Sequence, residues 1–141
     1  MELYIGGRAQ GKLSHVLQKY ENPVVFDERD FREKLDEKVW TTNAENGTDA
    51  SKQLIWNHFH LAVKALLAEG WEQEQIWNCV HAFMEENPGL VIIADEIGSG
   101  IVPMERDERI YRETTGRLLC RIAKKADSVE RIICGIPQKL K

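Results

Sequence analysis

The sequence has few of the residues that mark extracellular or membrane proteins. Its 141 residues include only three cysteines, Cys79, Cys120 and Cys134, which are far apart and form no C-x-x-C or histidine–cysteine ligand pattern. This usage argues against a disulfide framework and fits a reduced, cytoplasmic environment. No basic and apolar leader precedes the first predicted strand, so we expect no signal peptide. The longest apolar run is too short to span a bilayer, so we also expect no membrane span.

An excess of positive charge is also absent. The net charge of −4 gives no general attraction to nucleic acid or to anionic membranes. We therefore expect no nucleic-acid partner, and any phosphate binding must come from a local site. The length is that of one domain, so we predict a single domain over residues 1–141 with its own core.

The four histidines lack metal-ligand spacing. His58 and His60 are two positions apart, so they would face different sides of a helix. We expect His58 to be a core residue on the inward face of a helix, and His15 and His81 to lie on helix surfaces. The histidines therefore predict no metal site.

The feature around which the chain is organised is a glycine-rich turn near its start. The apolar residues Leu3, Tyr4 and Ile5 predict a short buried strand, which leads into a G-x-x-x-x-G-K pattern ending at Lys12. Glycines let the backbone approach phosphate oxygens, and the N-terminus of the next helix favours an anion. We expect Lys12 to act in catalysis near the β/γ-phosphates. The expected nucleotide-binding residues are Gly6, Gly7, Arg8, Ala9, Gln10, Gly11, Lys12 and Leu13.

One position departs from this pattern. The residue after the lysine is ordinarily Ser or Thr, whose hydroxyl binds Mg²⁺, and here it is Leu13. Ser14 lies about 100° further round a helix, so it is no simple substitute. The alternative interpretation is a tight strand-to-helix turn that binds nothing.

Along the rest of the chain, predicted strands alternate with predicted helices. We expect helices at about 11–20, 29–38, 50–69, 72–86 and 105–126, strands at 23–26, 90–94 and 129–134, an edge strand at 39–42 and a loop at 43–49. Residues 135–137 should end the last strand. Alternation of this kind predicts an α/β fold with a mostly parallel central sheet flanked by helices.

Acidic residues follow two of the predicted strands. In parallel sheets, ligands bind at the carboxyl ends of the strands, so the glycine loop, Asp27-Glu28 and Asp95-Glu96 should share one rim. We expect Asp95 to bind Mg²⁺ and Glu96 to act in catalysis by orienting a nucleophile. The alternative is a strand end that simply exits into solvent, where acidic residues are common.

The long helix at about 105–126 carries five arginines, interleaved with acidic residues. Pairing at i,i+4 spacing explains most of them. Arg112 and Arg117 are the best candidates if any bind phosphate. Gly116 lies within this helix at some cost in helix propensity, which indicates close packing or a ligand nearby.

Several of these motifs occur together, in the same order, in one enzyme family. They are G-G-x-x-x-G-K at the start, E-I-G-S-G-I-V-P at 96–103, Y-R-E-T-T-G at 111–116 and G-I-P-Q-K at 135–139. The chain thereby resembles the bifunctional adenosylcobinamide kinase/adenosylcobinamide-phosphate guanylyltransferases of cobalamin biosynthesis. The resemblance implies a phosphate-loop (P-loop) fold, binding of GTP or ATP, phosphorylation of adenosylcobinamide, and a homo-oligomer, since trimers are known in the family.

The middle of the chain departs from that family. The family transfers GMP through a guanylylated histidine on a helix after its second strand, and residues 27–39 here contain no histidine. The best match to its D-C-x-T strand end begins at Asn57, which lacks the acid, and its Asn-Gln pair appears as Leu119-Cys120. Asp95, where the family usually has Asn, could compensate for the missing acid.

These departures leave three hypotheses. The first is a shortened family member that binds GTP or ATP and acts as a kinase, without the histidine-dependent guanylyltransferase step, so that GTP gives no stable protein–GMP adduct. The second is a non-catalytic, nucleotide-binding or scaffold relative. The third is a structural descendant that binds no nucleotide.

Overall fold

We describe the protein from a computed structural model, which describes residues 1–37 and 52–141. Strands and helices alternate along most of this part of the chain. In order, they are β1 (Glu2–Gly6), α1 (Lys12–Leu17), β2 (Pro23–Phe26), α2 (Glu28–Glu37), β3 (Gln53–Trp56), α3 (Phe59–Ala68), α4 (Gln73–Glu86), β4 (Val91–Asp95), α5 (Arg106–Lys125), β5 (Ser128–Ile133) and β6 (Ile136–Lys139).

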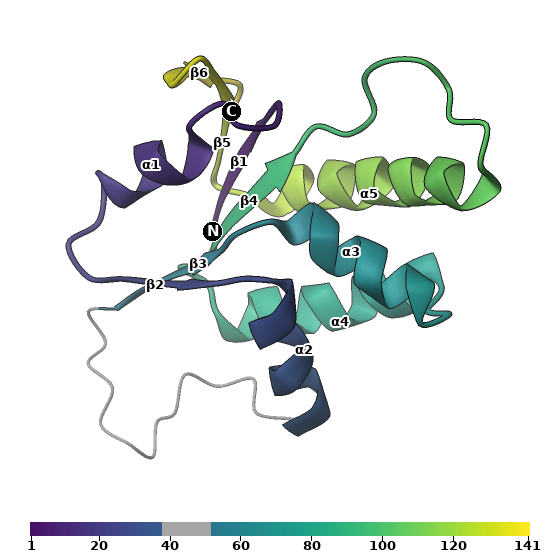
Figure 1. The fold of residues 1–141 in the computed structure, drawn as a ribbon. Coiled ribbons are helices and arrows are strands. Elements are labelled where there is room, and N and C mark those ends of the chain that lie inside the picture. Colours follow the sequence, from purple (N-terminus) through teal and green to yellow (C-terminus); the bar gives the residue numbers. More distant parts are fainter. Residues whose placement is uncertain (38–51) are drawn as a thin grey trace.

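The strands form one sheet in the order β2-β3-β4-β1-β5-β6 (Figure 1). The first five strands in this order are parallel, and β6 pairs antiparallel with β5. The sheet therefore confirms the predicted α/β fold with a mostly parallel sheet. Strand β1 lies between β4 and β5, so the chain leaves it at the centre of the sheet, where ligands of such folds bind.

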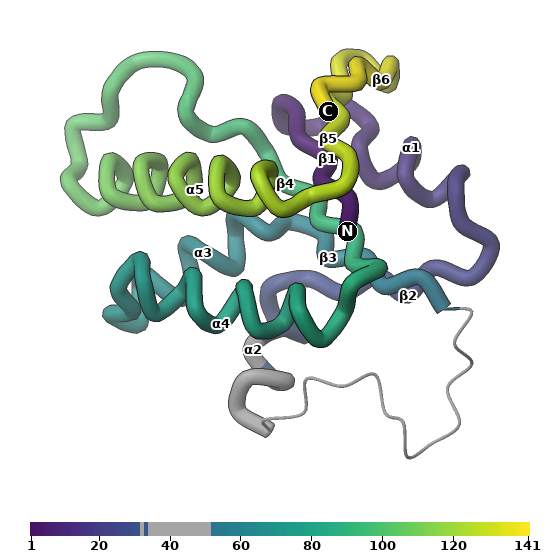
Figure 2. The backbone as a smooth tube through the Cα atoms, turned by 180° about the vertical axis from the view of Figure 1, so that it is seen from behind, coloured from purple at the N-terminus to yellow at the C-terminus, as the bar shows by residue number. Residues whose placement is uncertain are grey.

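The helices cover the two faces of the sheet unequally. Helix α1 packs on one face, where Val16 joins a small cluster of buried strand residues. Helices α2 to α5 gather on the opposite face and enclose the main core (Figures 1 and 2). Among the described residues, no helix is long and apolar enough to cross a membrane.

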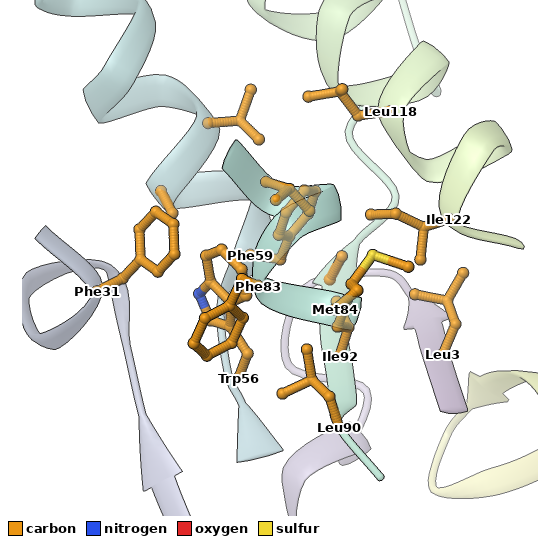
Figure 3. Packing of buried hydrophobic residues seen from close by; sticks show 14 of the residues in the cluster. Leu3, Phe31, Trp56, Phe59, Phe83, Met84, Leu90, Ile92, Leu118 and Ile122 are labelled. Carbon is orange, nitrogen blue, oxygen red and sulfur yellow. The ribbon is translucent and has the colours of Figure 1, made fainter. Parts of the chain in front are cut away.

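Aromatic side chains fill the main core beneath β3. The ring of Phe31 from α2 stacks on Trp56, with ring centroids 4.0 Å apart, and Phe83 from α4 meets Trp56 edge-on at 5.6 Å (Figure 3). Phe59 contacts the same indole from α3 at 5.1 Å. Offset and edge-to-face packing of this kind adds to the free energy gained from burial. The cluster therefore fixes α2, α3 and α4 relative to the end of β3.

Two predictions of secondary structure were wrong. The helix predicted for residues 50–69 begins only at Phe59, because Leu54, Ile55 and Trp56 form the buried strand β3 between β2 and β4. Strand β5 does end before residues 135–137, but it is not the last strand: Ile136 begins β6, in which Pro137 is tolerated because β6 is an edge strand. The other predicted helices and strands lie within a few residues of their observed bounds.

Gly116 is exposed on α5, and a side chain built there would meet nothing within 4 Å. The close packing predicted for it is therefore absent within the described part of the chain. The edge strand predicted at 39–42 and the loop predicted at 43–49 lie outside the described residues.

Candidate functional site

The glycine loop and the two acidic residues after β4 meet at the carboxyl end of the sheet. Strands β1 and β4 are neighbours, and Gly6 is in register with Asp95, so the segments that follow the two strands start side by side. They open into a cavity of about 700 Å³. Its lining residues are Arg8, Ala9, Gln10, Gly11, Lys12, Leu13, Ser14, Asn57, His58, His60, Leu61, Ile93, Asp95, Glu96 and Ile97.

The hairpin of β5 and β6 packs against the glycine loop and fixes its backbone. A β-carbon at Gly6 would lie 2.4 Å from the carbonyl oxygen of Ile132, so only glycine fits this position. The backbone N–H of Gly135 donates to the carbonyl of Gln10 at 2.9 Å, and the N–H of Cys134 donates to Gln10 Oε1 at 2.7 Å. These contacts fix the conformation of the loop.

This conformation leaves a row of hydrogen-bond donors free. Within residues 1–37 and 52–141, the backbone N–H groups from Gly7 to Leu13 donate no hydrogen bond of good geometry to another backbone group. Ala9 has φ 57° and Gly11 has φ 82°, and these left-handed conformations turn the backbone within the loop. Successive N–H groups in such turns form concave sites for anions. The free donors are thus available to phosphate oxygens.

Lys12 lies inside the site rather than in solvent. Its side chain is only 6% exposed, and Nζ is 2.6 Å from Asp95 Oδ1. It also donates to the carbonyl oxygens of Gly7, at 2.7 Å, and Gly6, at 3.3 Å. The ammonium group of Lys12 and the carboxylate of Asp95 therefore neutralise each other, and both residues line the cavity.

His60 is a residue of this site that the sequence did not indicate. It lies in the first turn of α3, it is buried, and its Nδ1 accepts a hydrogen bond of 3.1 Å from the backbone N–H of Asp95. Its Nε2 is 3.5 Å from Asp95 Oδ2. Burial lowers the pKa of His60 below its ordinary value, and the nearby Asp95 opposes this shift.

Glu96 is held by an arginine that the sequence analysis also missed. Arg131 on β5 donates from Nε and Nη2 to Glu96 Oε2, at 3.0 and 2.8 Å. Both bonds go to one oxygen, which leaves Oε1 with no protein donor among the described residues. The sequence carries no signal for this contact, because Arg131 and Glu96 are 35 positions apart and come together only through the sheet.

The prediction for His58 was wrong. His58 is exposed at the start of α3, with a left-handed φ of 55°, and it lines the cavity, whereas His60 is the buried histidine. The prediction failed because it counted helical spacing from Leu54. Leu54 lies in strand β3 and the helix starts only after His58, so that spacing does not tell which histidine faces inward. His15 and His81 are half-buried and pair with Glu130 and Glu85 respectively.

Leu13 and Ser14 lie at the edge of the cavity, but they differ in what they offer. Leu13 packs against the small core cluster beneath α1, which accounts for an apolar side chain at this position. Ser14 is exposed. Across residues 1–37 and 52–141, no group of three or more histidine, cysteine or acidic side chains could hold a metal ion by itself.

Three other candidates lie away from the cavity. Asp27 caps α2, since its Oδ1 accepts from the N–H of Arg29 at 2.9 Å. Arg112 donates to the carbonyl of Ile101 at 3.0 Å, and Arg117 pairs with Glu113 on the exposed face of α5. The structure therefore does not bring these residues to the glycine loop.

Two comparisons with known proteins bear on this site. The family model described as cobinamide kinase / cobinamide phosphate guanyltransferase matches residues 29–140. The bifunctional adenosylcobalamin biosynthesis protein CobU of Salmonella typhimurium (strain LT2) is 40% identical over 52 residues. That match covers 37% of this chain and spans only 29% of the length of the Salmonella protein.

Proposed function

Because the chain belongs to the cobinamide kinase / cobinamide phosphate guanyltransferase family, we propose that its cavity binds ATP or GTP and transfers a phosphoryl group to a cobinamide hydroxyl. The observation that carries the proposal is the phosphate loop itself. Its free N–H groups and the buried Lys12 face one cavity at the carboxyl end of β1. Phosphoryl transfer depends mainly on positioning and charge stabilisation, which such a loop supplies.

The free donors of the loop would bind the nucleotide phosphates. N–H groups from Gly7 to Leu13 offer hydrogen bonds that need no rearrangement of the backbone, because Gln10 and the hairpin already fix the loop. Lys12 would exchange Asp95 for the β/γ-phosphates, keeping a counter-charge throughout. A buried ammonium group without a counter-charge is costly, so this exchange should be tightly coupled to phosphate binding.

A magnesium ion fits the residues present, provided that the nucleotide brings most of its ligands. Among the described residues, Asp95 is the carboxylate that pairs with Lys12, and Mg²⁺ in proteins is commonly held by one or two carboxylates, phosphate oxygens and water. When bound, Mg²⁺ would neutralise charge on the phosphates. Without a cation, Asp95 would repel them, so we expect nucleotide affinity to depend on Mg²⁺.

Glu96 would act on the acceptor side. Arg131 holds one carboxylate oxygen, and the other is free to accept a hydrogen bond from the substrate hydroxyl. Glu96 would thereby orient the attacking oxygen and receive its proton. A cobinamide substrate is inferred from the family alone, since the chain spans a minor part of the length of the Salmonella relative.

We further propose that the histidine-dependent guanylyl transfer is absent, because residues 27–39 contain no histidine. Labelled GTP should leave no acid-labile GMP on the protein. The second candidate is a non-catalytic, nucleotide-binding relative, which the buried Lys12–Asp95 pair also permits, because that pair stabilises the loop without any chemistry.

Calorimetric titration with ATP and GTP, with and without Mg²⁺, tests the proposal. We expect micromolar binding that weakens at least tenfold without Mg²⁺, a change of about 1.4 kcal/mol in binding free energy for each factor of ten. We expect Lys12→Met to abolish binding. Lys64→Met, on the exposed side of α3, is the matched control. Asp95→Asn should abolish the dependence on Mg²⁺. Binding that ignores Mg²⁺ would favour the non-catalytic relative, and absence of binding would refute both.

A further inference from the structure

The end of β4 extends beyond its neighbour β3. The two strands pair only as far as Trp56 with Ile92, whereas β4 continues to Asp95. On its other side, β4 stays paired with β1 as far as Gly6 and Asp95. The last N–H of β4 on the β3 side therefore lacks a strand carbonyl, and a buried donor without an acceptor is costly.

The ring of His60 takes the place of the missing strand. Only Asn57 and His58 separate the end of β3 at Trp56 from the start of α3 at Phe59, and this short connection brings His60 against the end of β4. Nδ1 accepts the N–H of Asp95 at 3.1 Å. Since Nδ1 accepts, the proton of the neutral ring is on Nε2, the atom that lies 3.5 Å from Asp95 Oδ2.

We infer that His60 is a positioning residue, which orients the Asp95 carboxylate before nucleotide binds. One ring contacts Asp95 at its backbone and at Oδ2, while Lys12 contacts Oδ1. With both oxygens directed by fixed partners, the carboxylate needs no reorganisation when Lys12 turns to the phosphates. The expected consequence is that nucleotide binding depends on Mg²⁺, and this part of the inference rests on the proposed function.

Two substitutions of His60 distinguish this positioning role from a purely structural role. The side chain of Asn places an oxygen where Nδ1 lies, so His60→Asn keeps the acceptor for the Asp95 N–H and loses the Nε2–H group that lies 3.5 Å from Oδ2. The side chain of Gln places its amide nitrogen where Nε2 lies, so His60→Gln keeps the donor and loses the acceptor. His81→Gln on α4 controls for a histidine substitution outside the cavity.

The experiment is calorimetry of each variant with Mg²⁺-ATP and with ATP alone, together with thermal unfolding. We expect His60→Asn to unfold near the wild-type temperature, yet to bind Mg²⁺-ATP about tenfold more weakly, with little change for ATP alone. We expect His60→Gln to lose stability and to keep most of the Mg²⁺ dependence. Wild-type Mg²⁺ dependence in His60→Asn, or equal loss in both variants, would overturn the inference.

A second measurement does not depend on nucleotide binding. The ¹⁵N chemical shifts of the imidazole in the ligand-free protein, assigned by comparison with His60→Gln, report which nitrogen carries the proton. We expect the proton on Nε2. A proton on Nδ1 would overturn the inference even if nucleotide binds, whereas a proton on Nε2 without any nucleotide binding would refute the proposed function and leave the orientation of Asp95 standing.

Discussion

Two glycine-rich segments follow adjacent strands at the same end of the sheet, and they differ in how closely they pack against the rest of the protein. The phosphate loop, from Gly6 to Leu13, is fixed by the β5–β6 hairpin through Gln10 and through the close approach of Gly6 to Ile132. The segment between β4 and α5, residues 96–105, rises as a wide arch away from the sheet (Figure 1). Ile101 is 89% exposed there, and Met104 is 93% exposed.

Glycine content alone does not determine how firmly a loop is held. Gly6 has a backbone atom against the place where its side chain would be, whereas Gly98 and Gly100 have nothing within 4 Å. The arch is held chiefly by arginine side chains of α5, which donate to its carbonyl groups at Pro103 and Ile101. The phosphate loop is thus a packed part of the fold, and the arch is a surface feature.

Substituting one glycine in each segment should give the largest difference in stability. In Gly6→Ala, the new β-carbon would lie 2.4 Å from the Ile132 oxygen, a backbone atom that cannot move aside without disturbing β5. We expect the free energy of unfolding to fall by about 3 kcal/mol or more. Gly98→Ala meets open space and should change it by less than about 0.5 kcal/mol. Urea denaturation measures both, and similar losses would contradict the distinction.

Carboxylate neutralisation should have the next largest effect. Asp95→Asn leaves the ammonium of Lys12, whose side chain is 6% exposed, without its counter-charge. We expect a loss of about 2 kcal/mol, because removing one partner of a buried pair leaves the other charge unpaired. Glu113→Gln breaks the exposed pair with Arg117 beside the arch and should cost less than about 0.5 kcal/mol. Thermal unfolding in matched buffers compares them, and equal shifts would mean that the Lys12–Asp95 pair is effectively solvated.

The phosphate loop and the rim could be predicted from the sequence because their evidence is local. A strand, a G-x-x-x-x-G-K turn and a helix follow one another within a few residues, and an apolar run leads directly to Asp95. Parallel strands then bring the two together whatever the rest of the chain does, since their carboxyl ends share an edge. The register of Gly6 with Asp95 is the direct expression of this rule.

The supports of the site could not be predicted, because they depend on pairings between distant segments. The residues of β3 continue the helical spacing of α3, so a single sequence does not distinguish the short apolar strand from an extra helical turn. Without β3, the burial of His60 has no basis. Likewise, the hydrogen bonds from Cys134 to Gln10 and from Arg131 to Glu96 join residues more than 30 positions apart, which only the sheet order brings into contact.

The smallest effect should come from the arch itself. Met104 is 93% exposed and contributes almost no buried apolar area, so Met104→Ser removes little stabilisation from the fold. We expect the free energy of unfolding to change by less than about 0.5 kcal/mol, and ATP affinity to stay within twofold, because Met104 does not line the cavity at the phosphate loop. Denaturation and calorimetry on the same preparation measure the two quantities. A loss above 1 kcal/mol would mean that the arch packs against the body of the protein, and the contrast between the two glycine-rich segments would then fail.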